Sequence, residues 1–85
     1  MIRLKKSIAI SESGFVFDPM SGESFSVNEI GMKILSLIKE EKTAEEISQF
    51  FISGFDVDPA DFEKYFYDFV GMLRQYQLIE ENEPA

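Results

Sequence analysis

The sequence predicts an α+β domain in which a three-stranded antiparallel sheet is followed by three α-helices. In the first third of the chain, apolar residues alternate with polar ones, which is the two-residue period of a half-buried strand. From about residue 30 onward, apolar residues recur at spacings of three and four, which is the period of a helix with one buried side. The 85 residues suffice for one domain. We expect it to span residues 1–79, followed by a frayed acidic tail over residues 80–85.

The first strand is expected within residues 2–11, where the apolar residues share one parity. These residues are Ile2, Leu4, Ile8 and Ile10. Residues 11–14 have the sequence Ser-Glu-Ser-Gly, which is typical of a turn. Three consecutive strands joined by short turns favour an antiparallel meander in chain order. The first and third strands would then form the two edges of the sheet.

A hairpin is expected next, because two β-rich runs, residues 15–17 and 24–27, flank a turn sequence over residues 18–22. The turn contains proline and glycine, which are the residues that most often reverse a chain. We expect a three-residue loop over residues 20–22, with the glycine in the left-handed conformation.

The register of this hairpin follows from the rule that directly opposed residues share one face of a sheet. A three-residue loop places Phe17 opposite Phe25. It also places Phe15 opposite Val27, so that all four apolar side chains lie on one face. A four-residue loop would instead pair Phe17 with Ser24 and scatter the apolar face. The sequence therefore favours the three-residue loop.

Two short helices are expected after the hairpin, each with a recognisable start. Asn28 can cap the first helix, because its short side chain accepts a hydrogen bond from an unpaired backbone N–H. Thr43 and Glu46 have the spacing of a capping box at the start of the second helix, and Gly54 can end that helix. The apolar residues are Ile30, Ile34, Leu37 and Ile38 on the first helix and Ile47, Phe50 and Phe51 on the second.

The third helix is expected to be the longest, from a cap at Asp58 and a first-turn Pro59 to about Tyr76. One apolar stripe, which suffices to pack the helix on a small core, consists of Phe62, Phe66, Phe69 and Leu73. A second stripe, which makes the apolar arc wider than core packing requires, consists of Tyr65, Met72 and Tyr76. Two interpretations stay open at this point. The helix is either broadly buried in a core rich in phenylalanine, or it forms one wall of a groove where tyrosine and methionine contact a peptide.

The composition excludes several kinds of chemistry. The chain has no cysteine and no histidine, which rules out disulfides, thiolate zinc sites and nucleophiles activated by histidine. Its carboxylates cluster at helix starts, where capping explains them, and residues 56–61 lack the glycine of a calcium loop. We therefore expect no enzymatic activity, no metal and no cofactor. Residues 1–10 lack an apolar run long enough for a signal peptide or a membrane span, so we expect a cytoplasmic protein without membrane attachment.

The net charge of −8 is confined to the second half of the chain. Residues 1–43 contain six Lys or Arg and six Asp or Glu, whereas residues 44–85 contain two and ten. An acidic half repels phosphate and suits a basic partner, although it also favours solubility. A winged-helix regulator that binds nucleic acid would need a basic third helix, and the cations of that helix are Lys64 and Arg74. We therefore expect no binding to nucleic acid.

Four segments, taken together, resemble the PqqD family, the peptide chaperones of pyrroloquinoline quinone (PQQ) biosynthesis and their relatives that recognise other modified peptides. The segments are VNEIGMKILSLI at residues 27–38, KTAEEI at 42–47, FDVDP at 55–59, and LR at 73–74 before LI at 78–79. The resemblance covers roughly residues 5–79, and the order and spacing of the segments make it fairly specific. The chain departs from the family at Glu41 and Gln77, where the family often has glycine, and these positions concern the shape of two loops.

The resemblance implies a winged-helix-like domain that binds the leader segment of a precursor peptide and presents it to a modifying enzyme, often a radical S-adenosylmethionine enzyme. The leader would be added as a strand beside the third strand of the sheet and against the third helix. Carried onto this sequence, the peptide-binding residues are Glu23, Ser24, Phe25, Ser26 and Val27 on the strand and Tyr65, Phe69, Met72 and Tyr76 on the helix.

The leading hypothesis is therefore a non-catalytic peptide-binding chaperone. Two other classes of function remain as alternatives. One is a winged-helix regulator that binds nucleic acid, for which a basic surface on the third helix would be the discriminating feature. The other is a structural domain whose edge strand pairs with a second copy of the chain to form a homodimer.

Overall fold

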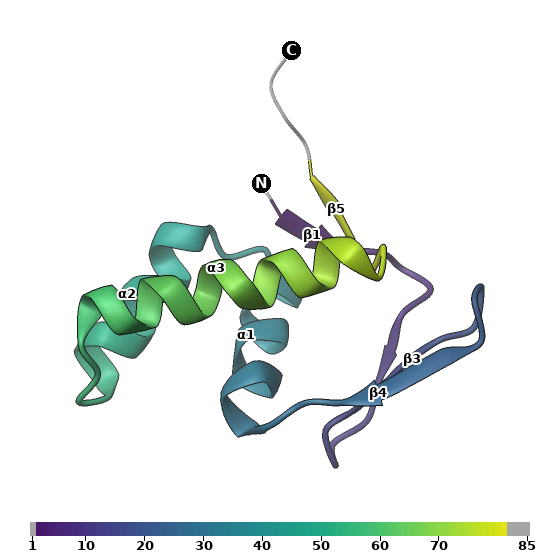
Figure 1. The fold of residues 1–85 in the computed structure, drawn as a ribbon, viewed down its shortest axis with the longest axis horizontal. Coiled ribbons are helices and arrows are strands. Elements are labelled where there is room, and N and C mark those ends of the chain that lie inside the picture. The colour runs from purple at the N-terminus through teal and green to yellow at the C-terminus, as the bar shows by residue number, and fades with distance from the viewer. Residues whose placement is uncertain (1, 82–85) are drawn as a thin grey trace.

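The computed structural model describes residues 2–81 and confirms the α+β class (Figure 1). Three helices follow a three-stranded antiparallel sheet, and a second, two-stranded sheet joins the two ends of the described chain. The strands are β1 (Ile2–Leu4), β2 (Ala9–Ile10), β3 (Phe15–Asp18), β4 (Glu23–Ser26) and β5 (Ile79–Glu81), and the helices are α1 (Glu29–Lys39), α2 (Ala44–Gly54) and α3 (Pro59–Gln75).

The single first strand expected over residues 2–11 is wrong, because the chain turns at residues 6–7 and forms two short strands that belong to different sheets. β2 pairs with β3, with Ile10 opposite Val16. β1 pairs instead with β5, with Leu4 opposite Ile79. The apolar parity continues across the turn, so periodicity alone does not reveal the break. The partner of β1 comes from the far end of the described chain, where no local pattern points to it.

Strand β5 also changes where the tail begins. From the sequence, Glu80 and Glu81 are expected in a frayed tail, but both residues belong to β5 and lie opposite Arg3 and Ile2. The pairing continues beyond the strand, since the N–H of Lys5 donates to the carbonyl of residue 78 at 3.0 Å. Backbone hydrogen bonds hold β5 in place, and such bonds cannot be predicted from a run of acidic side chains. The rest of the expected tail, residues 82–85, lies outside the described residues.

The predicted register of the hairpin is wrong as well. Phe17 lies opposite Ser24, and Phe25 lies opposite Val16. Val16 is completely buried, whereas Phe15 and Phe17 are 51% and 42% exposed. The face of the sheet that meets the core is therefore the face of Val16 and Phe25. The two phenylalanines of β3 lie on the outer face.

Asp18 accounts for the four-residue loop, residues 19–22, that produces this register. Its carboxylate accepts hydrogen bonds from the N–H of Met20 at 3.0 Å and from the hydroxyl group of Ser21 at 3.1 Å. Its carbonyl group accepts a further bond from the N–H of Gly22 at 2.8 Å, and Gly22 has a φ of 76°, which glycine adopts readily. These local bonds stabilise the longer turn, and apolar patterning contains no information about them.

The starts of the three helices agree with the prediction. Asn28, Thr43 and Asp58 are the N-caps of α1, α2 and α3. Thr43 and Glu46 form a reciprocal capping box, in which the N–H of Thr43 donates to the Glu46 carboxylate at 3.0 Å and the Thr43 hydroxyl oxygen accepts from the N–H of Glu46 at 3.1 Å. Two hydrogen bonds with Thr43 lower the pKa of Glu46. The larger effect comes from the bond with the backbone N–H of Thr43, and the smaller effect comes from the bond with its hydroxyl group. α3 ends at Gln75, one residue before the expected end.

The hydrophobic core lies between the three helices and extends to the inner face of the sheet. Its completely or almost completely buried side chains are Val16, Ile34, Leu35, Ile38, Ile47, Leu73 and Leu78. Ile30, which the sequence analysis places on the buried stripe of α1, is 44% exposed. Ile30 lies in the first turn of the helix, and the same stripe becomes completely buried one turn later, at Ile34. The core therefore begins deeper along α1 than the periodicity indicates.

Candidate functional site

The outer edge of β4 and the side of α3 nearest to it form the candidate functional site (Figure 1). β4 is an edge strand of its sheet, in which the order is β2-β3-β4. The ring of Phe25 on β4 stacks on the ring of Tyr76, the residue that caps the end of α3, with the two centroids 5.5 Å apart. This contact brings the strand and the end of the helix together. We call the surface between them the β4–α3 face.

The hydrogen bonds of the hairpin define which backbone groups of β4 point outward. The N–H of Val27 donates to the carbonyl of Gly14 at 2.8 Å, so the backbone groups of Val27 point toward the β3 side. Because the direction alternates along a strand, those of Phe25 also point toward β3. Ser24 and Ser26 then direct their N–H and C=O groups to the outer edge, where no further strand lies within residues 2–81. An extended peptide can pair with the backbone of the two serines.

The second apolar stripe of α3 lies at the boundary between core and solvent. Tyr65 and Met72 are half-buried, and Tyr76 is 44% exposed. Phe69 is buried below them, and its ring stacks on that of Tyr65 with centroids 6.2 Å apart. The stripe is thus packed on the core along one side and keeps apolar surface on the other. That remaining surface is available to a ligand.

The start of α1 closes one end of this face. The hydroxyl group of Tyr65 donates to Oδ1 of Asn28 at 3.3 Å, and the same oxygen accepts the capping bond from the N–H of Gly31 at 2.8 Å. Gly31 is buried against Phe69, and a Cβ at Gly31 would lie 3.0 Å from Cε1 of that ring. From the sequence, Asn28 is expected only as a helix cap. Its contact with Tyr65 spans 37 residues, so no local signal predicts it.

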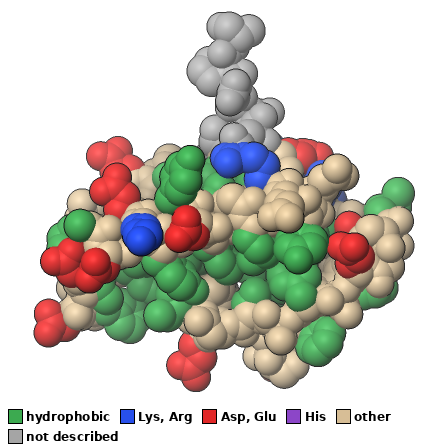
Figure 2. Space-filling model, viewed as in Figure 1, with side chains coloured by type: hydrophobic (Ala, Val, Ile, Leu, Met, Phe, Trp, Pro, Cys, Tyr) green, Lys and Arg blue, Asp and Glu red, His purple; other side chains and the backbone are tan. Residues whose placement is uncertain are grey.

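The nine predicted peptide-binding residues divide into two groups. The apolar group, whose side chains are packed on or within the core between β4 and α3, consists of Phe25, Val27, Tyr65, Phe69, Met72 and Tyr76. The polar group, which is exposed along β4, consists of Glu23, Ser24 and Ser26. Hydrophobic side chains gather below α3 and toward β4 on this side of the molecule (Figure 2). The site therefore combines a backbone edge with an adjacent apolar surface.

The β4–α3 face offers recognition chemistry. Its polar groups are backbone amides, hydroxyl groups and one carboxylate, and its apolar groups are aromatic rings and a thioether. Within residues 2–81, no cluster of three or more His, Cys, Asp or Glu side chains is placed to hold a metal ion. None of the helices in that part of the chain is long and apolar enough to cross a membrane. The arrangement is suited to holding an extended peptide.

Comparisons with known proteins identify relatives of this fold. A family model described as Coenzyme PQQ synthesis protein D (PqqD) matches residues 14–79. The solved structure of a lasso peptide synthetase B1 complexed with the leader peptide is 22% identical, with 94% of this chain and 98% of that chain covered and a TM-score of 0.82. The solved structure of TbiB1 in complex with the TbiA(beta) leader peptide is 24% identical, with 96% and 99% covered and a TM-score of 0.85. The search of curated proteins gave no match.

Proposed function

The chain belongs to the PqqD family, and on that premise we propose that it is a non-catalytic chaperone that binds the leader segment of a ribosomally made precursor peptide. The observation that supports this function most directly is the free outer edge of β4 beside a partly open aromatic surface on α3. The two solved structures of the same fold are both complexes with a leader peptide, which adds support.

In this proposal the leader binds as an additional strand beside β4. Ser24 and Ser26 each offer one N–H and one C=O at the outer edge, which allows four backbone hydrogen bonds. At a net contribution of about 0.5–1.5 kcal/mol each, these bonds supply roughly 2–6 kcal/mol. A micromolar complex requires about 8 kcal/mol. Side chains of the leader must therefore supply the difference.

Alternate side chains of the added strand would then determine which leader binds. One set points to the inner face of the sheet, where it meets Phe25, Met72 and Tyr76, and the other set points to the outer face beside the two serines. Complete burial of one large aliphatic side chain contributes about 1.5–3 kcal/mol. Two apolar leader residues, spaced two apart so that both point inward, would add roughly 3–6 kcal/mol to the backbone bonds before the entropy cost of association is subtracted.

The proposed chaperone presents the bound leader to a modifying enzyme in the cytoplasm, where precursor peptides are synthesised. The β4–α3 face supplies binding groups, so the chemical change of the precursor belongs to the enzyme. The family resemblance favours a radical S-adenosylmethionine enzyme as this partner. The chaperone would contribute by holding the flexible precursor in one extended conformation, which lowers the entropy cost of the enzyme's own binding step.

Titration calorimetry with a synthetic leader peptide tests this function. The probe is a synthetic leader peptide with two apolar residues spaced two positions apart, and a scrambled version of the same peptide is the control. We expect the leader to bind with micromolar affinity and the scrambled peptide to bind at least about tenfold more weakly.

We also expect no binding of duplex DNA at physiological salt, because residues 44–85 have a net charge of −8. Salt-sensitive DNA binding without leader binding would contradict the proposal and favour the winged-helix regulator.

A further inference from the structure

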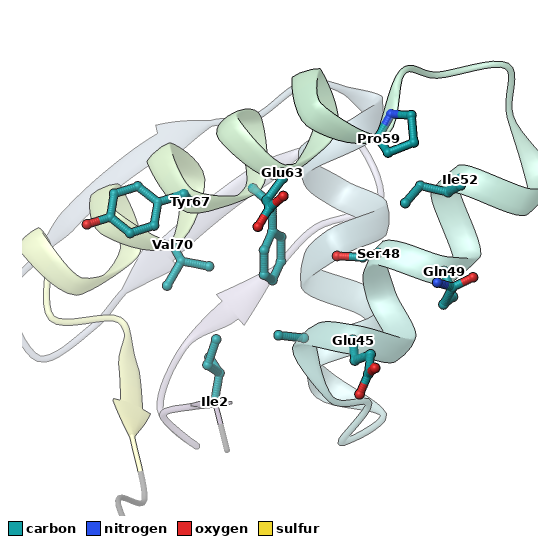
Figure 3. A pocket seen from close by; sticks show the side chains of 11 residues that line it. Ile2, Glu45, Ser48, Gln49, Ile52, Pro59, Glu63, Tyr67 and Val70 are labelled. Atoms are coloured by element: carbon teal, nitrogen blue, oxygen red, sulfur yellow. The ribbon is translucent and has the colours of Figure 1, made fainter.

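A pocket on the other side of α3 is not explained by leader binding. It has a volume of about 580 Å³ and lies between α2, α3 and β1 (Figure 3). Phe66 and Val70 form its buried floor, and Ile2, Ser48 and Ile52 form half-buried walls. We call it the α2–α3 pocket.

The α2–α3 pocket and the β4–α3 face lie on different sides of the same helix. Tyr67, which lines the pocket, follows Tyr65 by two positions, and Val70 precedes Met72 by two. Two positions along an α-helix correspond to a rotation of about 200°. A partner in the pocket would therefore leave the β4–α3 face open. The geometry allows a leader and a second partner to bind at the same time.

Tyr67 gives the pocket the character of a contact surface. Its side chain is 74% exposed although it lies in the middle of α3, so it contributes little to the core. Aromatic side chains are enriched where proteins meet, because they supply a large contact area at a low cost in conformational entropy. The exposed ring beside the buried floor of Phe66 and Val70 offers a place for an apolar anchor of the partner.

The rim of the pocket restricts the charge of that partner. Glu45 of α2 and Glu63 of α3 line the pocket, and none of its lining residues is Lys or Arg. A second copy of this chain, related by a two-fold axis, would bring the same carboxylates together. A nucleic acid would bring phosphate groups to them. A partner with lysine or arginine side chains complements this rim.

We propose that the α2–α3 pocket docks a basic amphipathic segment of the modifying enzyme. An apolar side chain of that segment packs on Phe66 and Val70, and its cationic side chains lie next to Glu45 and Glu63. This inference rests on the proposed function, since the enzyme that receives the leader is the partner. Docking on this side of α3 holds enzyme and leader on one small domain. It thereby raises the effective concentration of the leader at the enzyme.

A model peptide with the chemistry of the proposed segment tests the pocket directly. The probe is a synthetic amphipathic helix with leucines on one side and lysines on the other, and its control has glutamates in place of the lysines. Each peptide is titrated into the full isotope-labelled chain while the backbone amide signals are followed by NMR. We expect the lysine peptide to shift signals around the pocket, including those of Ser48, Ile52 and Val70. We expect the glutamate peptide to leave them unchanged.

Two charge variants on the same helix provide a matched comparison. Glu63→Lys and Asp68→Lys change the net charge equally, but position 63 lines the pocket and position 68 does not. We expect Glu63→Lys to weaken binding of the lysine peptide about tenfold and Asp68→Lys by less than about twofold. Tyr67→Ala should also weaken it about tenfold. All three residues are exposed, so the variants are expected to remain folded, which thermal melting verifies.

Three outcomes would overturn the inference. They are signal shifts concentrated on the outer sheet face at Phe15 and Phe17, equal weakening by the two charge variants, and self-association of the chain that Tyr67→Ala abolishes. The same samples are titrated with the leader peptide, whose affinity should be unchanged in Glu63→Lys. Failure of the unmodified chain to bind the leader would refute the proposed function, whereas the peptide map would still decide whether the pocket binds a basic segment.

Discussion

Neighbouring residues on α3 have different roles because they differ in burial. Met72 is half-buried at the β4–α3 face, whereas Leu73 is completely buried in the core. We expect Leu73→Ala to lower the free energy of unfolding by about 2–5 kcal/mol, as large-to-small core substitutions do. Met72→Ala should cost less than about 2 kcal/mol, since part of the side chain is already exposed to water, yet it should weaken leader binding. Chemical denaturation and calorimetry of both variants measure this. Equal losses of stability would assign Met72 to the core.

Two glycines within helices differ in what surrounds them. A Cβ at Gly31 would lie 3.0 Å from Cε1 of Phe69 and 3.2 Å from Cβ of Val27, whereas a Cβ at Gly71 would have no neighbour within 4 Å. Alanine favours a helix over glycine by about 1 kcal/mol, so Gly71→Ala should raise the free energy of unfolding by up to that amount. Gly31→Ala should lower it, because the buried ring of Phe69 and the side chain of Val27 would both have to move. Denaturant unfolding curves decide, and equal stabilisation by both substitutions would contradict the close packing of α1 on α3.

Among the larger elements, α2 depends on the reciprocal bonds at its start. Thr43→Ala removes one of them and should cost about 1 kcal/mol of stability.

The pKa of Glu46 is lowered from its ordinary value of 4.5, so its carboxylate stabilises the fold above that pH. This contribution is lost as the pH falls through the lowered folded-state pKa. Glu46→Gln keeps an acceptor that does not titrate, so its stability should fall less steeply than that of the unmodified chain under acidic conditions. Parallel curves of stability against pH would contradict this role of Glu46.

The helices could be predicted from the sequence because their determinants are local. Asn28, Thr43 and Asp58 each act on backbone groups within three positions. The strands could be predicted only in part. β1 pairs with β5 from the far end of the described chain, and the hydrogen bonds of Asp18 within the turn determine the register of the hairpin. Apolar periodicity contains neither kind of information.

The candidate site shows the same division between local and distant determinants. The stripe of Tyr65, Met72 and Tyr76 is visible in the sequence as helical spacing, and its partial exposure is consistent with the wider arc that the spacing predicts. The contact of Tyr65 with Asn28 was not predictable, because it joins residues that are 37 positions apart. The peptide-binding role of these residues stays a prediction.

For the whole molecule, α3 is the element that relates the two proposed binding surfaces. The domain is flat, with extents of 37 × 36 × 20 Å, and α3 crosses it between the hairpin and α2 (Figure 1). The β4–α3 face lies on one side of this helix and the α2–α3 pocket on another. The excess of negative charge belongs to the helical half, and β4 itself contains one glutamate and no Lys or Arg. The two proposals together would place two partners on one domain of this size.

Addition of a leader strand at β4 depends on which backbone groups of that strand point outward. Proline removes one N–H donor, so its effect should alternate along the strand. At the outward positions, Ser24→Pro and Ser26→Pro should leave the chain folded and weaken leader binding by at least about tenfold. At the inward position, Phe25→Pro should lower the free energy of unfolding by at least about 2 kcal/mol, whereas Phe25→Leu keeps both the donor and most of the apolar volume and should be tolerated.

Titration calorimetry of folded Ser24→Pro and Ser26→Pro with the leader peptide is the most direct measurement, with Ser24→Ala and Ser26→Ala as controls that keep the backbone donor. We expect the two alanine variants to bind the leader like the unmodified chain. We expect the two proline variants to melt cooperatively and to have lost most of their affinity for the leader. Folded proline variants that bind the leader with unchanged affinity would contradict strand addition at β4.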